Sequence, residues 1–293
     1  MATLSATPEK NQPIKLMLLG YSGTGKTTAY ASLAVDKLID NKPAYNLFIL
    51  DFDTKAEEMI RAALSALVKD KKISQSQHDE ALSRCDVAVC KENTGIVPVS
   101  AAGGTVDKIG VVGKATAWTT AVKQLKTWAN SLDDQSILIV DSLTYAAKAA
   151  ANWSMGANNK LNRELTWQDY QGPQQLVENL ITIAADAACN AIITGHQNPV
   201  ELYKNTGRLD DKGNVVEELM DTVVVPTSIG KAGSIKLPAR FNHLLVVSDG
   251  ISKDRRIWTK PTAGVTTKTP FFARCKDYYP ISTGLAEYFA LRV

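Results

Sequence analysis

The chain has 293 residues, of which 45% are hydrophobic and 22% are charged, and its formal net charge is +3. This composition is ordinary for a globular protein, and the length fits one large α/β domain or two small ones. The charge is too small to indicate a polyanionic partner by itself, and no apolar run approaches the length of a membrane span. We therefore expect a cytoplasmic protein with no membrane partner.

The N-terminal residues are polar and lack the apolar stretch of a secretion signal. We expect residues 1–12 to be a disordered lead-in and residues 13–293 to form a single domain. The four cysteines make no CxxC pair and no zinc pattern with the histidines. They are expected to be buried free thiols in a reducing compartment.

The strongest signal follows an apolar segment, residues 14–19, that predicts a strand. Residues 20–27 read GYSGTGKT and match G-x-x-x-x-G-K-[ST] at every fixed position, and residues 28–39 then have apolar side chains at helical spacing. Glycines let such a turn wrap an anion, which the N–H groups at the helix start bind. A chance glycine-rich turn is the alternative, but the flanking strand and helix favour a phosphate loop. The motif predicts nucleoside triphosphate binding by Gly20, Ser22, Gly23, Thr24, Gly25, Lys26, Thr27 and Thr28.

Two side chains of this loop have distinct expected roles. Lys26 is expected to reach the β- and γ-phosphates and so to take part in catalysis. The hydroxyl of Thr27 is expected to bind Mg²⁺.

Residues 45–53 predict a buried strand that ends in two acids, Asp51 and Asp53, and residues 54–69 predict an amphipathic helix. A carboxylate at this strand end could orient and deprotonate an attacking water. We favour Asp53 for this role over Glu57 and Glu58, which fall inside the helix. The alternatives are that one or both aspartates cap the helix at Thr54 or bind Mg²⁺ in its outer shell.

The middle of the chain adds a short strand at residues 86–90 and then a glycine-rich stretch, residues 91–114, expected to be a long loop or a small hairpin. Residues 115–132 predict a helix whose tryptophans pack in the core.

Residues 136–141 are the most strand-like run and end in Asp141. A buried parallel strand would place this acid beside the phosphate loop, as a ligand of Mg²⁺ together with Thr27. Ser142 follows in place of a glutamate, so the group that activates water must come from elsewhere.

The later elements are a mixed region at 143–170, a helix at 172–190 and a strand from 191 that ends in His196 and Gln197. Gln197 or His196 could touch the γ-phosphate, or could only make turn hydrogen bonds. No helix is expected in residues 199–235, although residues 222–225 could form a strand. Residues 241–248 and 255–259 predict a hairpin, and a short helix is expected at 284–291. Alternating strands and helices followed by an antiparallel addition indicate one α/β domain with a mixed sheet.

This order of motifs resembles that of RecA-like P-loop ATPases, in particular the compact single-domain ones encoded by bacteriophages and related to phage recombination ATPases. The resemblance covers about residues 14–285 and implies a mostly parallel central sheet with a C-terminal antiparallel addition. It also implies ATP and Mg²⁺ as cofactors and a location in the cytoplasm of the host cell. It places Asp53 where RecA-like proteins keep a catalytic carboxylate, often a glutamate. The shorter aspartate would need a different water position, so we expect slow hydrolysis that DNA or oligomer formation stimulates.

The resemblance also implies a homo-oligomer with ATP between protomers and a basic pair supplied by the neighbour. Arg274 and Lys276 fit this spacing on a predicted strand, where alternation puts both on one side. There they would stabilise the charge of the transferring phosphoryl group. The alternative is an ordinary solvated basic strand end.

In RecA-like filaments two loops hold single-stranded DNA, and here these correspond to about residues 153–170 and 198–234. Aromatic platforms and bases at these positions suit stacking and phosphate contact. The candidates are Trp153, Lys160, Arg163, Trp167, Lys204 and Arg208, although acids match the bases of the second loop.

Two functions therefore remain from the sequence. One is an ATPase that promotes DNA strand annealing or exchange, with single-stranded DNA and a single-strand binding or annealing protein as partners. The other is an ATP-switched assembly or loading factor that acts on a partner protein. A small-molecule kinase is a weaker third option, because only Arg163 could serve in its lid.

Overall fold

The structure is a computed structural model that describes residues 12–39, 44–100, 106–157, 167–209, 215–228, 236–249, 254–261 and 266–292. The expected lead-in, apart from Gln12, lies outside the described residues. Within them, no helix is both long and apolar enough to cross a bilayer.

A mixed sheet of eight strands forms the centre of the described structure, in the order β12-β11-β10-β1-β7-β6-β2-β3. Neighbours from β10 to β3 run parallel, and β11 and β12 add to β10 in antiparallel register. The predicted α/β class with a late antiparallel addition is thus confirmed. The strands are β1 (Lys15–Gly20), β2 (Asn46–Asp51), β3 (Cys85–Val89), β6 (Ser136–Asp141), β7 (Asn190–Gly195), β10 (His243–Asp249), β11 (Arg255–Trp258) and β12 (Tyr278–Pro280).

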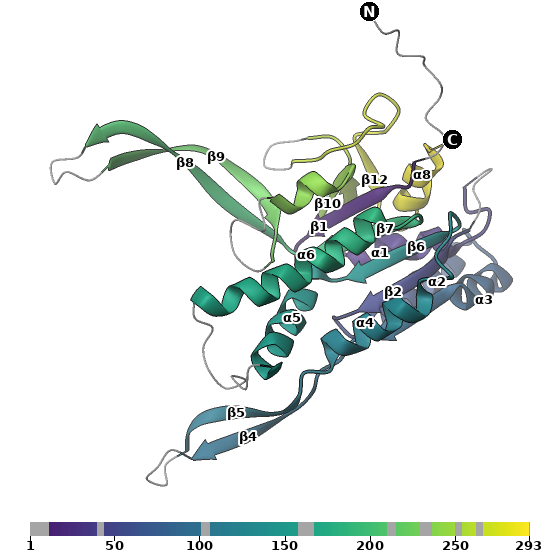
Figure 1. Cartoon of the computed structure of the whole chain (residues 1–293). Helices are drawn as coiled ribbons and strands as arrows, with labels where there is room; N and C mark the ends of the chain where they lie inside the picture. The colour runs from purple at the N-terminus through teal and green to yellow at the C-terminus, as the bar shows by residue number, and fades with distance from the viewer. Residues whose placement is uncertain are drawn as a thin grey trace, which may run out of the picture.

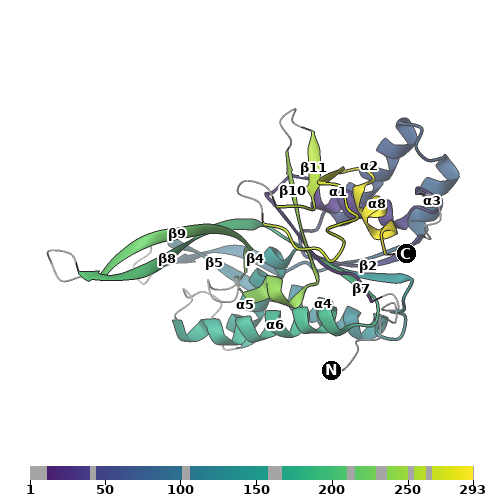
Figure 2. The ribbon, with the colours of Figure 1, turned by 90° about the horizontal axis from the view of Figure 1, so that it is seen from above.

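Helices cover both faces of this sheet (Figures 1 and 2). Alternate residues of β1 belong to different cores: Leu16 and Leu18 pack on one face, Met17 and Leu19 on the other. A strand buried on both faces reads as a continuous apolar run, which explains why residues 14–19 are apolar apart from Lys15. One face carries α1 (Lys26–Ala31), α2 (Ala56–Lys69), α3 (Gln75–Ser83) and α8 (Gly284–Ala290); the other carries α4 (Ala117–Trp128), α5 (Leu143–Ala157) and α6 (Gln171–Asp186).

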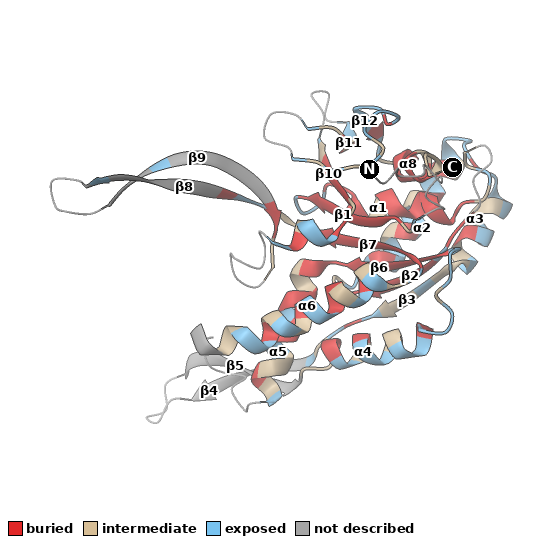
Figure 3. Cartoon of the chain, turned by 45° about the horizontal axis from the view of Figure 1, so that its top comes forward, coloured by how far each residue is buried: buried red, intermediate tan, exposed pale blue. Residues whose placement is uncertain are grey.

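Two hairpins project from the same side of this core (Figure 1). One consists of β4 (Asn93–Ser100) and β5 (Val106–Lys114), the other of β8 (Gln197–Leu209) and β9 (Val215–Pro226). The hairpin alternative for residues 91–114 is confirmed, and the possible strand at 222–225 is part of the longer β9. Figure 3 shows buried residues concentrated in the sheet and its covering helices.

Two local expectations are wrong. The helix after the phosphate loop ends at Ala31 and continues only as a single 3₁₀ turn, Ser32–Ala34, where the Ser32 hydroxyl donates to the Ala29 carbonyl. Residues 274–276 are not a strand: the N–H groups of Arg274 and Cys275 both donate to the Phe271 carbonyl, which makes a turn.

Candidate functional site

The phosphate loop connects β1 to α1 at the carboxyl edge of the sheet, where ligands of open α/β folds bind. Gly23 and Gly25 have φ angles of 78° and 96°, in the left-handed region that glycine adopts without strain. A pocket of about 200 Å³ opens beside the loop and is lined by Ser22, Gly23, Gly25, Lys26, Thr27, Asp53, Lys55, Ala56, Met59, Asp141, Ser142 and His196. The sequence therefore folds its main motif into one wall of a polar cavity.

Lys26 is buried and lines this pocket. Its ammonium donates to the carbonyls of Gly20 and Tyr21, both at 2.9 Å. Burial lowers the pKa of Lys26, while Asp141 and Asp53 oppose that shift. Because the ammonium group is desolvated and lies beside an open cavity, an anion that binds there would stabilise its charge.

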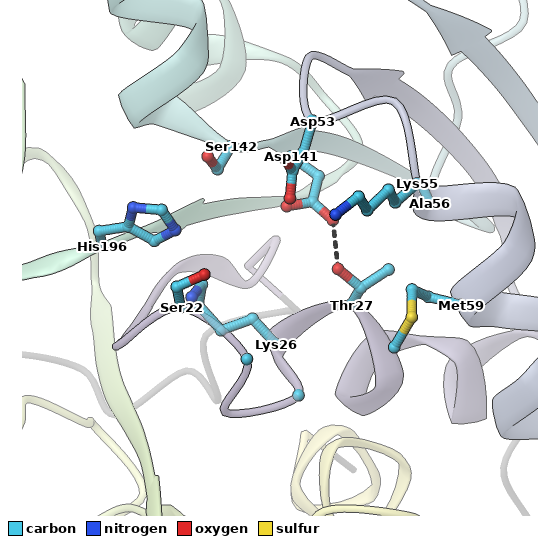
Figure 4. Close-up of a pocket in the computed structure, with 12 residues that line it drawn as sticks. Ser22, Lys26, Thr27, Asp53, Lys55, Ala56, Met59, Asp141, Ser142 and His196 are labelled. Atoms are coloured by element: carbon cyan, nitrogen blue, oxygen red, sulfur yellow. Dashed lines mark hydrogen bonds between the residues drawn. The ribbon is translucent and has the colours of Figure 1, made fainter.

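Asp141 is held by three hydroxyl donors, two from α1 and one from β7. Its Oδ2 accepts from Thr27 Oγ1 at 2.7 Å and from the buried Tyr30 hydroxyl at 2.8 Å, and its Oδ1 accepts from Thr194 Oγ1 at 2.6 Å. The structure thus brings the two expected metal ligands, Thr27 and Asp141, into direct contact (Figure 4).

The two acids at the end of β2 differ in their surroundings: Asp51 is the last residue of the strand, and Asp53 lies two residues beyond it. Asp51 caps α2, accepting from the N–H groups of Thr54 at 2.7 Å and Ala56 at 2.9 Å. Asp53 instead lines the pocket, and burial raises its pKa, helped by the nearby Asp141 carboxylate. The capping alternative therefore applies to Asp51, and Asp53 remains available for chemistry.

Two further pocket residues come from the ends of β6 and β7. His196 lines the pocket, whereas Gln197 begins β8 and pairs with Pro226 outside it. Burial lowers the pKa of His196, and the Lys26 charge lowers it further. Ser142 also lines the pocket, and its buried hydroxyl has no hydrogen-bond partner. The sequence signal for Ser142 was its place directly after the Asp141 strand.

The residues present fit a magnesium nucleotide. Buried hydroxyls rarely stay unpaired, so the Ser142 hydroxyl indicates a polar ligand or water in the pocket. No group of three or more His, Cys, Asp or Glu that could hold a metal occurs among the described residues. Proteins usually bind Mg²⁺ through one or two carboxylates together with substrate phosphates. Thr27 and Asp141 would hold the ion, and the ion would neutralise phosphate charge.

The remaining candidates do not join this pocket within the chain. Arg274 lies over the Phe271 ring at 5.1 Å, and Lys276 pairs with Glu287 at 2.7 Å. Trp153 is partly buried against the core, and Arg208 is exposed on β8. Lys160 and Arg163 lie outside the described residues, as do the side chains of Trp167 and Lys204.

A phosphate loop, its buried lysine and a hydroxyl–carboxylate pair at the edge of a mostly parallel sheet define a P-loop ATPase. The chain belongs to the AAA domain family, whose model matches residues 12–271.

Among solved structures the chain is similar to a prototypical ATPase from the type III secretion system of pathogenic bacteria, at 14% identity with a TM-score of 0.39. The match covers 81% of this chain and 52% of that one, so the chain spans about half of that ATPase. A comparison with curated proteins gives no match.

Proposed function

We propose that this protein hydrolyses ATP with Mg²⁺ as a RecA-like ATPase and that it works as an oligomer on single-stranded DNA in phage recombination or replication. The observation that carries the catalytic part is the convergence of Lys26, Thr27, Asp53 and Asp141 on one pocket. These groups come from three separate strand ends, which an accidental glycine-rich turn would not bring together.

Asp53 is the proposed general base. It lies in the pocket with Asp141 and Lys26, while the neighbouring Asp51 is committed to the helix cap. The raised pKa of Asp53 moves its proton affinity toward the operating range of a base. Ser142 and His196 are polar neighbours suited to positioning water.

The sheet order supports the RecA-like assignment. The phosphate-loop strand β1 and the Asp141 strand β6 are separated by β7, so the polar end of β7 lies between the loop and the metal acid. His196 follows β7 and reaches the pocket there.

The β8–β9 hairpin is the proposed route from nucleotide to DNA. His196 directly precedes β8, and its carbonyl accepts at 2.7 Å from the N–H of Thr227, which directly follows β9. A change at the γ-phosphate end of the pocket would thus act directly on both strands of the hairpin. Lys204 and Arg208 lie farther along β8 as proposed DNA contacts.

Oligomer formation and catalysis by a neighbour are part of the same proposal. Arg274 and Lys276 do not line the pocket of their own chain, and the proposal assigns them to the pocket of a neighbouring protomer. Arg274→Ala should lower turnover, and mixed oligomers with a Lys26→Ala partner should recover part of it. Unchanged turnover of Arg274→Ala would remove this role.

The test of the DNA role is ATP turnover with and without single-stranded DNA across a salt series. Stimulation at low salt that declines steeply as salt rises is expected, because phosphate contacts release counterions. If ATP is hydrolysed but DNA does not stimulate turnover at any salt concentration, the ATPase proposal stands and DNA is rejected as the partner.

One observation favours the second candidate, an ATP-switched assembly or loading factor acting on a partner protein. The strands β8 and β9 carry two basic residues against four acidic ones, and Lys204 lies opposite Glu218 in the ladder. This excess of acidic residues favours a protein partner over a polyanion such as DNA. Turnover insensitive to DNA, together with loss of a protein complex on hairpin removal, would establish this candidate.

A further inference from the structure

The antiparallel addition at the C-terminal end of the chain reaches back to the phosphate loop. A methyl group placed on Gly25 would lie 3.6 Å from both Cδ and Nη1 of Arg255 and 3.3 Å from Cγ1 of Ile281. Gly25 itself lines the pocket. A guanidinium group therefore lies beside the loop, although it belongs to a distant part of the sequence.

We propose that Arg255 binds the phosphates of the nucleotide from within the same chain, on the side nearer the nucleoside. This inference rests on the proposed nucleotide binding at the phosphate loop and deepens it. The ligand class is a nucleoside di- or triphosphate.

The fold fixes the backbone of Arg255 on two sides. Arg255 pairs with Asp249 of β10, the strand next to β1, and its carbonyl accepts from the Ile281 N–H at 3.3 Å. Both residues that approach Gly25 are thus tied to each other and to the strand beside the loop. Such support holds a binding residue in place better than a free loop would.

The ionic environment of Arg255 leaves its charge available. Its Nε is 3.9 Å from Asp249 Oδ1, and the two side chains are 48% and 64% exposed. An exposed pair at this distance contributes little stability, so the guanidinium can exchange it for a phosphate at small cost. Arginine binds phosphate through paired N–H groups, which makes this exchange favourable.

The neighbouring Arg256 has a different environment and provides a matched control. It makes a 2.6 Å ion pair with Asp254 and lies 4.1 Å from the centre of the Tyr278 ring. Successive strand residues point to opposite faces, so Arg256 faces away from the loop side that Arg255 occupies.

The position of Arg255 also indicates which part of the nucleotide it contacts. Under the proposed function the terminal phosphate and metal belong beside Lys26, Thr27, Asp53 and Asp141, whereas Arg255 approaches the loop at Gly25. It would therefore contact a part that ADP and ATP share. This distinguishes it from a residue that acts only on the transferred phosphate.

The test is equilibrium binding of Mg-ATP and Mg-ADP, by calorimetry, to the wild type and to Arg255→Gln, Arg256→Gln and Lys26→Ala. Arg255→Gln should weaken both nucleotides by a similar factor, about tenfold, as expected for loss of one charged hydrogen-bonding group. Arg256→Gln should bind like the wild type. Arg255→Lys retains the charge without the paired N–H groups, so its nucleotide affinity should lie between those of Arg255→Gln and the wild type. It replaces Arg255→Gln in the test if the glutamine variant does not fold.

Two results would overturn the inference: wild-type affinity in Arg255→Gln and Arg255→Lys, or a loss confined to ATP. If the wild type bound no nucleotide, or Lys26→Ala bound as well as the wild type, the proposed function itself would fail. Wild-type binding lost in Lys26→Ala but kept in Arg255→Gln rejects only the role of Arg255.

Discussion

The carboxyl edge of the sheet and the β8–β9 hairpin differ in how their described side chains are placed. At the sheet edge, Asp141 accepts three side-chain hydrogen bonds and Lys26 is buried against backbone carbonyls. On the β8–β9 hairpin, the described buried side chains Val200 and Val225 lie near its base, while Arg208 farther out is exposed.

The contrast separates a rigid chemical site from an adaptable surface. Charges desolvated and fixed by several donors are preorganised, and their interactions with a ligand are stronger than in water. A hairpin that projects from the core can present its side chains to a partner. We therefore expect substitutions at the sheet edge to change ATP turnover itself. Changes in the hairpin should alter only how a partner affects that turnover.

Loss of the lysine charge should have the largest effect. Lys26→Ala is expected to lower ATP turnover about 100-fold or more, since the cation that lines the proposed phosphate pocket is removed. Steady-state phosphate release measures this. Turnover near the wild-type level would show that the pocket is not where ATP reacts.

Asp53→Asn is expected to separate binding from chemistry. Turnover should fall about 100-fold, within the range contributed by general bases, while Mg-ATP affinity stays close to that of the wild type. Single-turnover kinetics with a parallel binding titration measure both.

Asp51→Asn is the matched control, because its amide oxygen still accepts hydrogen bonds from the start of α2. It should retain turnover and lose at most about 1 kcal/mol of stability. Full activity of Asp53→Asn would exclude Asp53 as the base.

Shortening the β8–β9 hairpin should leave basal turnover intact and abolish coupling to the partner. Glu201 and Thr222 are paired in the ladder, so residues 202–221 can be replaced by an Asn-Gly turn. The readout is ATPase activity with and without single-stranded DNA.

Shortening the β4–β5 hairpin is the control for specificity. Ile96 and Val111 are paired there, so residues 97–110 can be replaced by the same turn, and this variant should keep its DNA stimulation. DNA stimulation that survives shortening of β8–β9 would disconnect this hairpin from the proposed route.

The smallest expected effect is on stability as a function of pH. The folded-state pKa of Asp53 is raised, so its protonated form favours folding; that contribution is complete below the unfolded pKa and is lost as pH rises through the folded pKa. Asp53→Asn should therefore melt at a higher temperature than the wild type at neutral pH, with the gap closing in acid. If the melting temperatures of Asp53→Asn and the wild type were equal at neutral pH, or differed more in acid, the pocket would not destabilise the ionised Asp53 carboxylate.

The sequence predicted the site best where one local motif contains the chemistry. The loop at residues 20–27, the acid ending β6 and the antiparallel addition follow from short-range pattern and periodicity. The roles of Asp51 and Asp53 stayed open because alternation places both on one side of a strand, and only the turn at Thr54 separates the helix cap from the pocket.

What the sequence did not predict depends on contacts between distant segments. Arg255 lies beside Gly25 only because β11 folds onto β10 next to the phosphate-loop strand. His196 rather than Gln197 lines the pocket because β7 ends at Gly195 and β8 begins at Gln197, a register that composition does not fix. The predicted strand at Arg274 failed because local backbone hydrogen bonds to Phe271 favour a turn.

The cysteines of this chain also make it suited to fluorescence labelling. All four are free, Cys189 and Cys275 are buried, and burial raises the pKa of Cys85 and Cys90 to about 12. Maleimide dyes react with thiolates, so the native thiols should remain unlabelled while the protein is folded. A cysteine introduced in place of the exposed Glu218 of β9, which is not a proposed DNA contact, would then carry the dye alone, and movement of the hairpin could be observed in single molecules during turnover.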